Sequence, residues 1–324
     1  MTFVAYDVSN GGPNLAVRTA TAADRGSAWP GVPKPVEVCD IAEDESGVFV
    51  VDGGVTVPSG RKGSALRFAA PSGEYRALVK DAPRPLRKVA QDHDALYVFD
   101  VATTTLGIAR IDKSTGAKRT LVKLPPKTSF HALAEAPDGL LVGTCDDSFR
   151  ESLAPGADKA VGADSSCTIS KVSTSSGAVT PLVRKIGGVY ALRVSGDQLF
   201  FAEGRNGDVG RVALQGGAIT WLAKDQGEVW SLDVDDTRVY FTSHAAGELR
   251  VVRREGGSVA TIATKIEGIH AVHVRGDDVF VRTNVVGVMY EAAVEFPTPM
   301  SDMQGRDRLL HANRAALLRA AGAL

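Results

Sequence analysis

A repeat with a period of 40 residues limits the possible folds of this chain more than any other feature. The copies GVYALRVSGDQLFFAE, EVWSLDVDDTRVYFTS and GIHAVHVRGDDVFVRT follow one another in strict register between residues 187 and 283. Leu192, Leu232 and Val272 are equivalent positions, each 40 residues after the one before. Self-similarity at a fixed period is typical of repeat proteins, in which every copy forms one supersecondary unit.

Each copy reads as two pairs of short strands. Alternating apolar residues precede a Gly-Asp or Asp-Asp turn and an apolar run follows it, which predicts a β-hairpin. A second strand pair follows with a glycine at its turn, Gly217 in one copy and Gly257 in the next, because glycine adopts positive φ at little cost. Four strands in about 40 residues are typical of a β-propeller blade.

The whole chain therefore predicts an all-β fold, a six-bladed β-propeller with four-stranded blades, in residues 1–300. The units begin near residues 36, 85, 129, 187, 227 and 267. In the last unit we expect strands at 270–274, 279–283 and 286–292 but no fourth strand before Phe296. Because an open sheet edge is a liability, we expect an N-terminal strand, 15–21 or failing that 2–8, to complete the last blade and close the ring.

Residues 301–324 predict a C-terminal α-helix outside the propeller. Ser301 and Asp302 are good N-cap residues, and residues 306–324 carry Leu310, Leu317 and Leu318 on one side of a helix. Two interpretations stay open: the helix packs on the propeller, or it docks a protein partner or a second copy of the chain.

Composition excludes some partners. The chain has 324 residues, 44% of them hydrophobic and 23% charged, as in ordinary globular proteins, and its formal net charge is -1. A charge so close to zero attracts neither nucleic acid nor an anionic membrane. No apolar run is long enough to span a bilayer, and residues 1–14 do not resemble a signal peptide, so we expect a cytoplasmic protein.

The third unit carries an insertion, residues 146–166, between Cys145 and Cys167. It is either a lid or a tolerated surface loop. The two cysteines at its base are candidates for cross-strand neighbours that form a disulfide. Because an odd number of three cysteines fits a reducing compartment better than a disulfide scaffold, we expect free thiols.

Equivalent positions in the units predict a ring of varied side chains at the mouth of the central channel. The starting end of each first strand and the finishing end of each second strand lie on the same face. At the start of the first strand the residues are Cys39, Arg87, His131, Tyr190, Trp230 and His270. At the end of the second strand they are Asp52, Asp100, Thr144, Glu203, Ser243 and Thr283, followed closely by Asp146, Asn206, His244 and Asn284.

This variety favours a ligand pocket, since a purely structural ring would tend to repeat one residue type. We predict that His131 or His270 acts as a base, Tyr190 as an acid, Arg87 as an anion anchor and Trp230 as a stacking wall. The other interpretation is that these side chains plug the channel and hydrogen-bond one another.

A divalent metal on the axis is a further hypothesis. His131 and His270 belong to units three and six, which face each other in a six-fold ring. Carboxylates and Cys39 are available to complete such a shell, and this mixed set of ligands would suit zinc or a related ion. No other cofactor is indicated.

The units GVYALRVSGDQLFFAE and EVWSLDVDDTRVYFTSHAAGELRVV resemble the YWTD and NHL repeats of six-bladed propellers, over residues 36–292. Such propellers include protein-binding receptor modules, gluconolactonase-like hydrolases with an axial divalent metal, and the lyase that completes peptide amidation. The lyase has histidines at the starts of its innermost strands, and FHAL at His131 and IHAV at His270 match these places. A third matching histidine is absent, since Tyr190 or Trp230 stands there.

Two functions follow as hypotheses. The first is an enzyme of the lyase or hydrolase type that uses acid–base chemistry on a small polar or peptide-like ligand. The alternative is a non-catalytic propeller that binds a protein or peptide on the same face. A deep cavity that encloses both histidines would favour the enzyme, and a flat aromatic rim would favour the binding protein.

Overall fold

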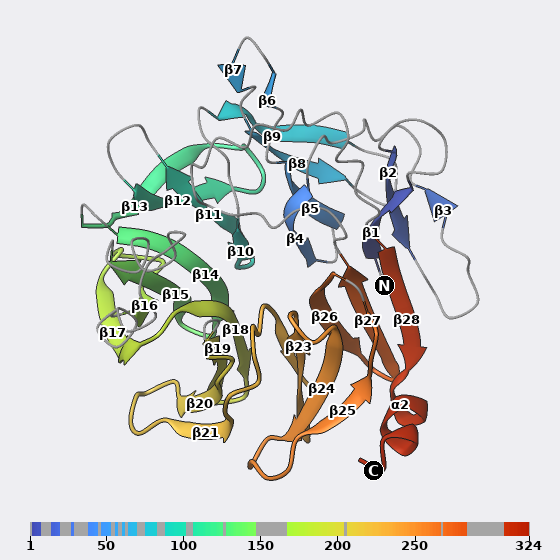
Figure 1. Cartoon of the computed structure of the whole chain (residues 1–324). Coiled ribbons are helices and arrows are strands. Elements are labelled where there is room, and N and C mark those ends of the chain that lie inside the picture. Colours follow the sequence, from blue (N-terminus) through green and yellow to red (C-terminus); the bar gives the residue numbers. More distant parts are fainter. Residues whose placement is uncertain are drawn as a thin grey trace. The chain divides into compact units, whose positions relative to one another are not determined.

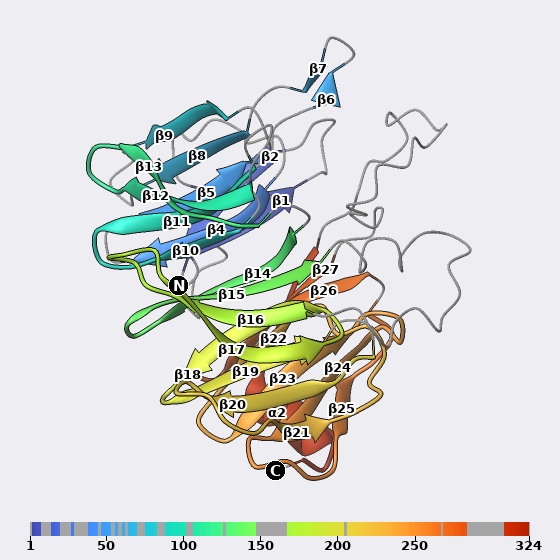
Figure 2. The same ribbon diagram turned by 90° about the vertical axis from the view of Figure 1, so that its left-hand side faces the viewer.

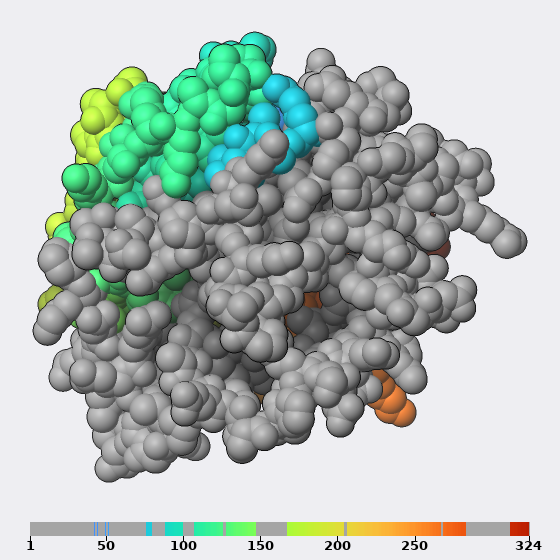
Figure 3. Space-filling view, turned by 90° about the horizontal axis from the view of Figure 1, so that it is seen from above, coloured from blue at the N-terminus to red at the C-terminus, as the bar shows by residue number. Residues whose placement is uncertain are grey.

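A computed structural model shows antiparallel β-sheets and, among the described residues, one short helix. It describes residues 2–7, 14–19, 27–28, 38–44, 47–52, 56–57, 60–61, 64–69, 75–82, 88–101, 106–125, 128–146, 167–203, 206–266, 268–283 and 308–323. Figure 3 shows in colour the residues whose side chains are described. The chain divides into two compact units, and each is described by itself. Unit 1 comprises Met1–Thr128, Pro137–Leu140 and Val172–Ala178, and unit 2 comprises Ser129–Ala136, Leu141–Lys171 and Val179–Leu324.

Unit 1 contains two four-stranded antiparallel sheets and two smaller ones (Figure 1). The strands of the four-stranded sheets are β4 (Val38–Asp44), β5 (Gly47–Asp52), β8 (Ser64–Ala69) and β9 (Tyr75–Ala82), and then β10 (Val89–Gln91), β11 (Ala95–Val101), β12 (Leu106–Asp112) and β13 (Lys118–Lys123). The smaller sheets consist of β1 (Thr2–Asp7), β2 (Asn14–Thr19) and β3 (Ser27–Ala28), and of β6 (Thr56–Val57) and β7 (Gly60–Arg61). Phe49, Val51, Leu96 and Ile111 are among the side chains of a core between the two larger sheets.

Unit 2 contains three further four-stranded sheets and a sheet of three strands (Figure 2). Two turns of the first of these sheets, Pro137–Leu140 and Val172–Ala178, are assigned to unit 1. The four-stranded sheets are β14 (Thr128–Ala136), β15 (Gly139–Asp146), β16 (Cys167–Val172) and β17 (Val179–Ile186); β18 (Val189–Ser195), β19 (Gln198–Glu203), β20 (Val209–Ala213) and β21 (Thr220–Ala223); β22 (Leu232–Val234), β23 (Arg238–Ser243), β24 (Glu248–Arg253) and β25 (Ala260–Ala263). The last sheet has β26 (Ile269–Arg275), β27 (Asp278–Thr283) and β28 (Arg308–Asn313).

The repeat register is confirmed. Leu192, Leu232 and Val272 are 9%, 4% and 0% exposed, so all three equivalent residues are buried. Each lies opposite a buried residue of the next strand, in the pairs Leu192–Phe201, Leu232–Phe241 and Val272–Val281. The apolar faces of successive sheets pack together in unit 2, which is why these first strands are apolar at every second position. The turn glycines Gly217 and Gly257 have φ of 130° and 120°, as predicted.

Closure of the ring by an N-terminal strand stays a prediction, because the N-terminal strands belong to unit 1 and the last sheet to unit 2. β1 and β2 pair with each other, and β2 pairs with β3. The third strand of the last sheet is β28, which pairs with β27 along six residue pairs from Asp278–Asn313 to Thr283–Arg308. The predicted strand 286–292 lies outside the described residues, as do Phe296 and the predicted N-cap residues Ser301 and Asp302.

A C-terminal helix is confirmed, but it is shorter than predicted. α2 spans Arg314–Ala320, because residues 308–313 of the predicted helix form β28. The side chain of Asn313 caps the helix by accepting a hydrogen bond from the backbone N–H of Ala316 at 3.1 Å. Leu318 is 3% exposed and belongs to the core beneath β25 and β28, so the helix packs on its own unit.

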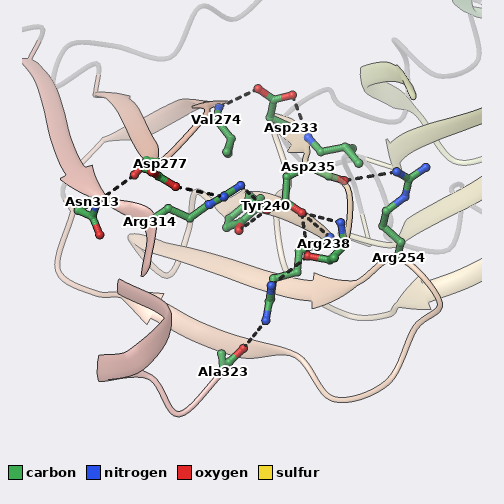
Figure 4. A network of polar contacts seen from close by, with 12 residues as sticks. Asp233, Asp235, Arg238, Tyr240, Arg254, Val274, Asp277, Asn313, Arg314 and Ala323 are labelled. Atoms are coloured by element: carbon green, nitrogen blue, oxygen red, sulfur yellow. Dashed lines mark hydrogen bonds and ion pairs between the residues drawn. The ribbon is translucent and has the colours of Figure 1, made fainter. Parts of the chain in front are cut away.

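Ion pairs hold α2 beside the turn between β22 and β23 (Figure 4). Arg314 Nη1 lies 3.0 Å from Asp235 Oδ2, and Arg314 Nη2 lies 3.5 Å from Asp277 Oδ1. Arg238 donates to the carbonyl of Ala323 at 2.9 Å. The boundary between a propeller domain and residues 301–324 stays a prediction. No helix among the described residues is long and apolar enough to cross a membrane.

Candidate functional site

An extra residue interrupts the first strand of three sheets at the same place. The register jumps between Val38 and Asp40 in β4, between Val189 and Ala191 in β18, and between Ile269 and Ala271 in β26. The skipped residues are Cys39, Tyr190 and His270, all predicted members of the ring. Because a β-bulge leaves its extra residue unpaired and re-aims its side chain, this irregularity positions ring residues differently from the strand around them.

Trp230 occupies the corresponding point of the sheet that begins with β22. The backbone N–H of Thr242 donates to the carbonyl of Ser231 at 3.0 Å, and the N–H of His244 donates to the carbonyl of Glu228 at 2.8 Å. Trp230 lies between these two paired positions, 40 residues after Tyr190 and 40 before His270.

Five predicted ring residues of unit 2 come together in a line of half-buried rings, which we call the aromatic row: His131, Tyr190, Trp230, His244 and His270. Tyr190 stacks on Trp230 with ring centroids 5.8 Å apart and planes 8° apart. His131 lies at the Tyr190 end of the row, where the two rings meet edge to face with their centroids 6.0 Å apart. His244 and His270 lie 4.9 Å and 5.4 Å from the Trp230 ring. All five belong to the predicted ring, and they come from four different sheets.

Hydrogen bonds orient the three histidines. The hydroxyl of Ser129 donates to the Cys145 carbonyl at 3.3 Å, so its oxygen is available to accept from Nε2–H of His131 at 2.9 Å. His244 Nδ1 donates to the Ile269 carbonyl at 2.7 Å, which leaves its Nε2 as an acceptor. His131 is therefore held by a partner in its own strand, β14, and His244 by a partner in β26 of the next sheet.

His270 has an arginine as its partner. Arg282 Nη2 lies 3.0 Å from His270 Nδ1, and because a guanidinium can only donate, Nδ1 accepts and the ring proton sits on Nε2. Arg282 was not predicted. It lies on β27 opposite Ala271, where the equivalent residues of the two preceding units are Ala202 and Thr242. A charged residue at a position otherwise held by small ones is the signal that could have revealed it.

Glu203 lies at the end of β19, paired in register with Val189 next to Tyr190. Only 6% of it is exposed. Burial raises the pKa of this carboxyl and nearby Asp208 raises it further, while hydrogen bonds from the Gly187 backbone and the Asn206 side chain oppose the rise. Asn206 donates from Nδ2 at 3.2 Å and is itself exposed. Glu203 and Asn206, both predicted members of the ring, are therefore joined by a hydrogen bond.

The other predicted residues are placed as follows. The backbones of Cys39, Asp52 and Asp100 belong to strands of unit 1, that of Thr283 ends β27, and none of these four side chains is described. Arg87 and Asn284 lie outside the described residues. Ser243 is buried and donates to the carbonyl of Gln226 at 2.8 Å, a structural contact. Thr144 and Asp146 are half-buried at the end of β15.

Among the residues that the structure describes, no three His, Cys, Asp or Glu side chains come close enough together to hold a metal ion. The set proposed from the sequence, His131 and His270 with Cys39 or carboxylates, includes side chains that are not described. Glu228 is a further acid that sequence reasoning missed: its Oε2 accepts from Trp230 Nε1 at 3.3 Å.

The expectation of free thiols is wrong. Cys145 and Cys167 form a disulfide with an S–S distance of 2.02 Å, and both are buried. They lie at the end of β15 and the start of β16, so the disulfide joins two adjacent strands at the base of the insertion. Residues 147–166 of the insertion lie outside the described residues, and their role as a lid or a surface loop stays a prediction.

A cavity of about 250 Å³ lies away from the aromatic row, against α2. Its lining residues are Asp235, Asp236, Thr237, Arg238, Arg314, Ala315 and Leu318. The carboxylate of Asp235 is already shared by the Tyr240 hydroxyl at 2.7 Å and by Arg314. We therefore assign this cavity to the docking of the helix.

Comparison with known proteins identifies the fold. No protein-family model matches the chain, and no curated protein matches its sequence. Regucalcin, a calcium-binding protein from Agrobacterium tumefaciens strain C58, is similar in structure, with a TM-score of 0.53, 16% identity, and coverage of 75% of this chain and 80% of that one. A chain of a nidogen/laminin complex gives a TM-score of 0.52 and 12% identity, with coverage of 73% and 84%. The chain has a β-propeller fold. Identities this low show the fold alone.

Proposed function

We propose that this protein binds a small polar or peptide-like ligand on the aromatic row. The observation that carries the proposal is the parallel stack of Tyr190 and Trp230, flanked by three oriented histidines. Flat rings that are half-buried offer large contact area at low entropic cost, since each has only two side-chain torsions to fix. Four sheets of unit 2 contribute to the row, so the surface is continuous across them.

Polar atoms on the row supply orientation. His244 Nε2 is an acceptor, and Glu228 holds the indole N–H of Trp230. A flat aromatic or amide group lying on the Trp230 ring would therefore find a hydrogen-bond acceptor at its edge. Binding sites typically combine apolar walls with a few placed polar groups in this way.

The names of the structural neighbours agree with a binding role. One is a calcium-binding protein, and the other belongs to a protein–protein complex. Proteins with this fold therefore include one that binds an ion and one that takes part in a protein complex. The proposal includes that this chain is a propeller of the YWTD, NHL or gluconolactonase-like type. A protein that presents a peptide segment to the aromatic row is the corresponding macromolecular partner.

The test uses N-acetyl-tryptophanamide, a neutral peptide-like probe, and follows both the backbone amide and the indole N–H signals in a ¹H–¹⁵N spectrum. We expect a saturable shift of the Trp230 signal, and no binding to a Trp230→Ala variant. Trp221→Phe is the control, because Trp221 packs edge-on against Phe201 at 5.6 Å, outside the aromatic row. Equal binding by wild type and Trp230→Ala would refute the proposal.

A second candidate is acid–base catalysis on the bound ligand, of the hydrolase or lyase type. It rests on Glu203, whose backbone pairs with Val189 next to Tyr190, because a buried carboxyl with a raised pKa is suited to act as a general acid. Chromogenic esters, amides and lactones would be screened as substrates. The rate should fall as pH rises through the raised pKa of Glu203, and Glu203→Gln should abolish turnover while probe binding is unchanged. Turnover that survives in Glu203→Gln would exclude this role.

A further inference from the structure

Arg282 has no acidic partner among the residues that the structure describes. Its one hydrogen bond among the described residues goes from Nη2 to His270, and no ion pair involves it there. Its Nε atom is buried and has no hydrogen-bond partner in the described part of the chain. By contrast, Arg193, Arg250 and Arg314 in the same unit each lie against a carboxylate. A buried donor on a charged group costs free energy when it stays unpaired, so such a group needs an explanation.

The position of Arg282 supplies one. It lies on β27 opposite the bulge that contains His270, and His270 stands 5.4 Å from Trp230 at one end of the aromatic row. The guanidinium is half-buried and is the only cation that touches a member of the aromatic row in the contacts of the described residues. An anionic group of a ligand on the row would pair with the open donors of Arg282.

We infer that Arg282 binds a carboxylate of the ligand, and that the aromatic row with Arg282 recognises a flat group joined to that carboxylate. The inference rests on the proposed function and names its ligand class. A guanidinium presents donors in a fixed plane that matches a carboxylate. A singly charged carboxylate fits better than a dianionic phosphate, because Glu228 lies against Trp230 in the row and opposes a second negative charge.

The hydrogen bond to His270 fits this role. Because Arg282 can only donate, it fixes His270 with its proton on Nε2, and His270 in turn restrains the guanidinium. A side chain held in this way loses less entropy when the ligand binds. His270 is therefore a positioning residue for Arg282 in addition to being a wall of the site.

The experiment compares two probes that differ in one group, N-acetyl-tryptophan and N-acetyl-tryptophanamide, by the same indole N–H signals. Wild type should bind the acid at least about tenfold more tightly than the amide, as expected for a hydrogen bond to a charged group. Arg282→Gln should abolish this preference, so that the acid and the amide bind this variant with equal affinity. Arg282→Lys keeps the positive charge but lacks the planar guanidinium, so it should retain part of the preference for the acid.

Arg253→Gln is the matched control, since Arg253 is an exposed arginine of β24 in the same unit. It should keep the full preference for the acid, which excludes a general effect of net charge. A thermal unfolding curve for each variant shows whether it is folded. If Arg282→Gln does not fold, the comparison of the two probes is made with Arg282→Lys instead. Acetate should compete with the acid more strongly than inorganic phosphate does at equal ionic strength.

The outcomes separate the two proposals. If both probes bind wild type equally, or if Arg282→Gln keeps the preference, the carboxylate inference fails while the aromatic row stands as a binding surface. Stronger competition by phosphate would overturn the choice of carboxylate. If neither probe binds, the proposed function fails, and the inference fails with it.

Discussion

The backbone N–H of Gly187 donates a hydrogen bond to the carboxylate of Glu203, at so close an approach that a Cβ on residue 187 would lie 2.1 Å from Glu203 Oε1. Glu203 is buried and cannot easily move aside. We therefore expect Gly187→Ala to destabilise the protein by about 1–3 kcal/mol, as overpacking does. Chemical denaturation measures the change. Glu203→Ser should relieve it, because the equivalent residue of the next unit is Ser243; an equal cost in both backgrounds would show that the contact is not the cause.

The raised pKa of Glu203 predicts how stability depends on pH. The folded state holds this proton more tightly than the unfolded chain, so stability is lost as pH rises from the unfolded value of 4.5 through the folded pKa. Glu203→Gln should therefore be more stable than wild type at pH 8, by about 1.4 kcal/mol for each unit of pKa difference. The two should be equal at pH 4. A variant less stable than wild type at pH 8 would contradict the assignment of burial as the dominant cause.

The hydrogen bond between Tyr240 and Asp235 predicts that stability changes with pH in the opposite direction, falling as the pH becomes acid. Burial would raise the pKa of Asp235, but hydrogen bonds from the backbone of Thr237, the Tyr240 hydroxyl and the backbone of Arg238 lower it overall. The stability from this carboxylate is present above its unfolded value of 3.8 and is lost as pH falls below it. Tyr240→Phe should cost about 1.5–3 kcal/mol at pH 7 and less below pH 3.

The same pair occurs in unit 1, where the Tyr97 hydroxyl donates to Asp92 at 2.5 Å. The pKa of Asp92 is also lowered, since hydrogen bonds from Tyr97 and the backbone overcome the effect of burial. Tyr97→Phe should therefore reproduce the result for Tyr240→Phe in denaturation curves at pH 7 and pH 3. A loss that is independent of pH in both variants would mean that packing, and not the hydrogen bond, is removed.

Leu318 anchors α2. Leu318→Ala should cost about 2–5 kcal/mol in unfolding free energy, as for other buried leucines, while Arg319→Ala, an exposed neighbour, should change it by less than about 0.5 kcal/mol. Denaturant unfolding followed by circular dichroism compares the two. Similar values would indicate that the helix is not docked in solution.

The disulfide predicts a thiol count. Denatured protein that has not been reduced should react with one equivalent of a thiol reagent, at Cys39, and reduced protein with three, because the chain has three cysteines. Replacing Cys145 and Cys167 by alanine should cost about 3 kcal/mol, given the 22-residue separation. Three reactive thiols without reductant would contradict the disulfide. That outcome would support a cytoplasmic location, because disulfides are rare in reducing compartments. The cytoplasmic location itself stays a prediction.

The members of the aromatic row could be found from the sequence because the repeat aligns them. Equal spacing put Tyr190, Trp230 and His270 at the same point of successive units, and the structure brings them into contact. Arg282 was missed because it lies one position before the end of β27, opposite the bulge, and sequence spacing alone does not show that a bulge turns His270 toward it.

The errors at the C-terminus and at the cysteines have different causes. Leu310 and its neighbours fit a helical pattern, but the open edge of β27 provides hydrogen-bond partners that make residues 308–313 a strand. Cys145 and Cys167 were expected to be thiols from a general argument about the compartment, although their places on adjacent strands allowed a disulfide.

The pairing of β27 with β28 also sets an order of events during synthesis. Residues 278–283 and 308–313 are separated by two dozen residues, and the sheet that begins with β26 cannot gain its third strand until the second of these segments has left the ribosome. Arg282, on β27, is therefore translated before its own sheet is complete. At roughly 5–20 residues per second the delay is a second or more, during which the nascent chain exposes an unpaired strand edge that chaperones could recognise.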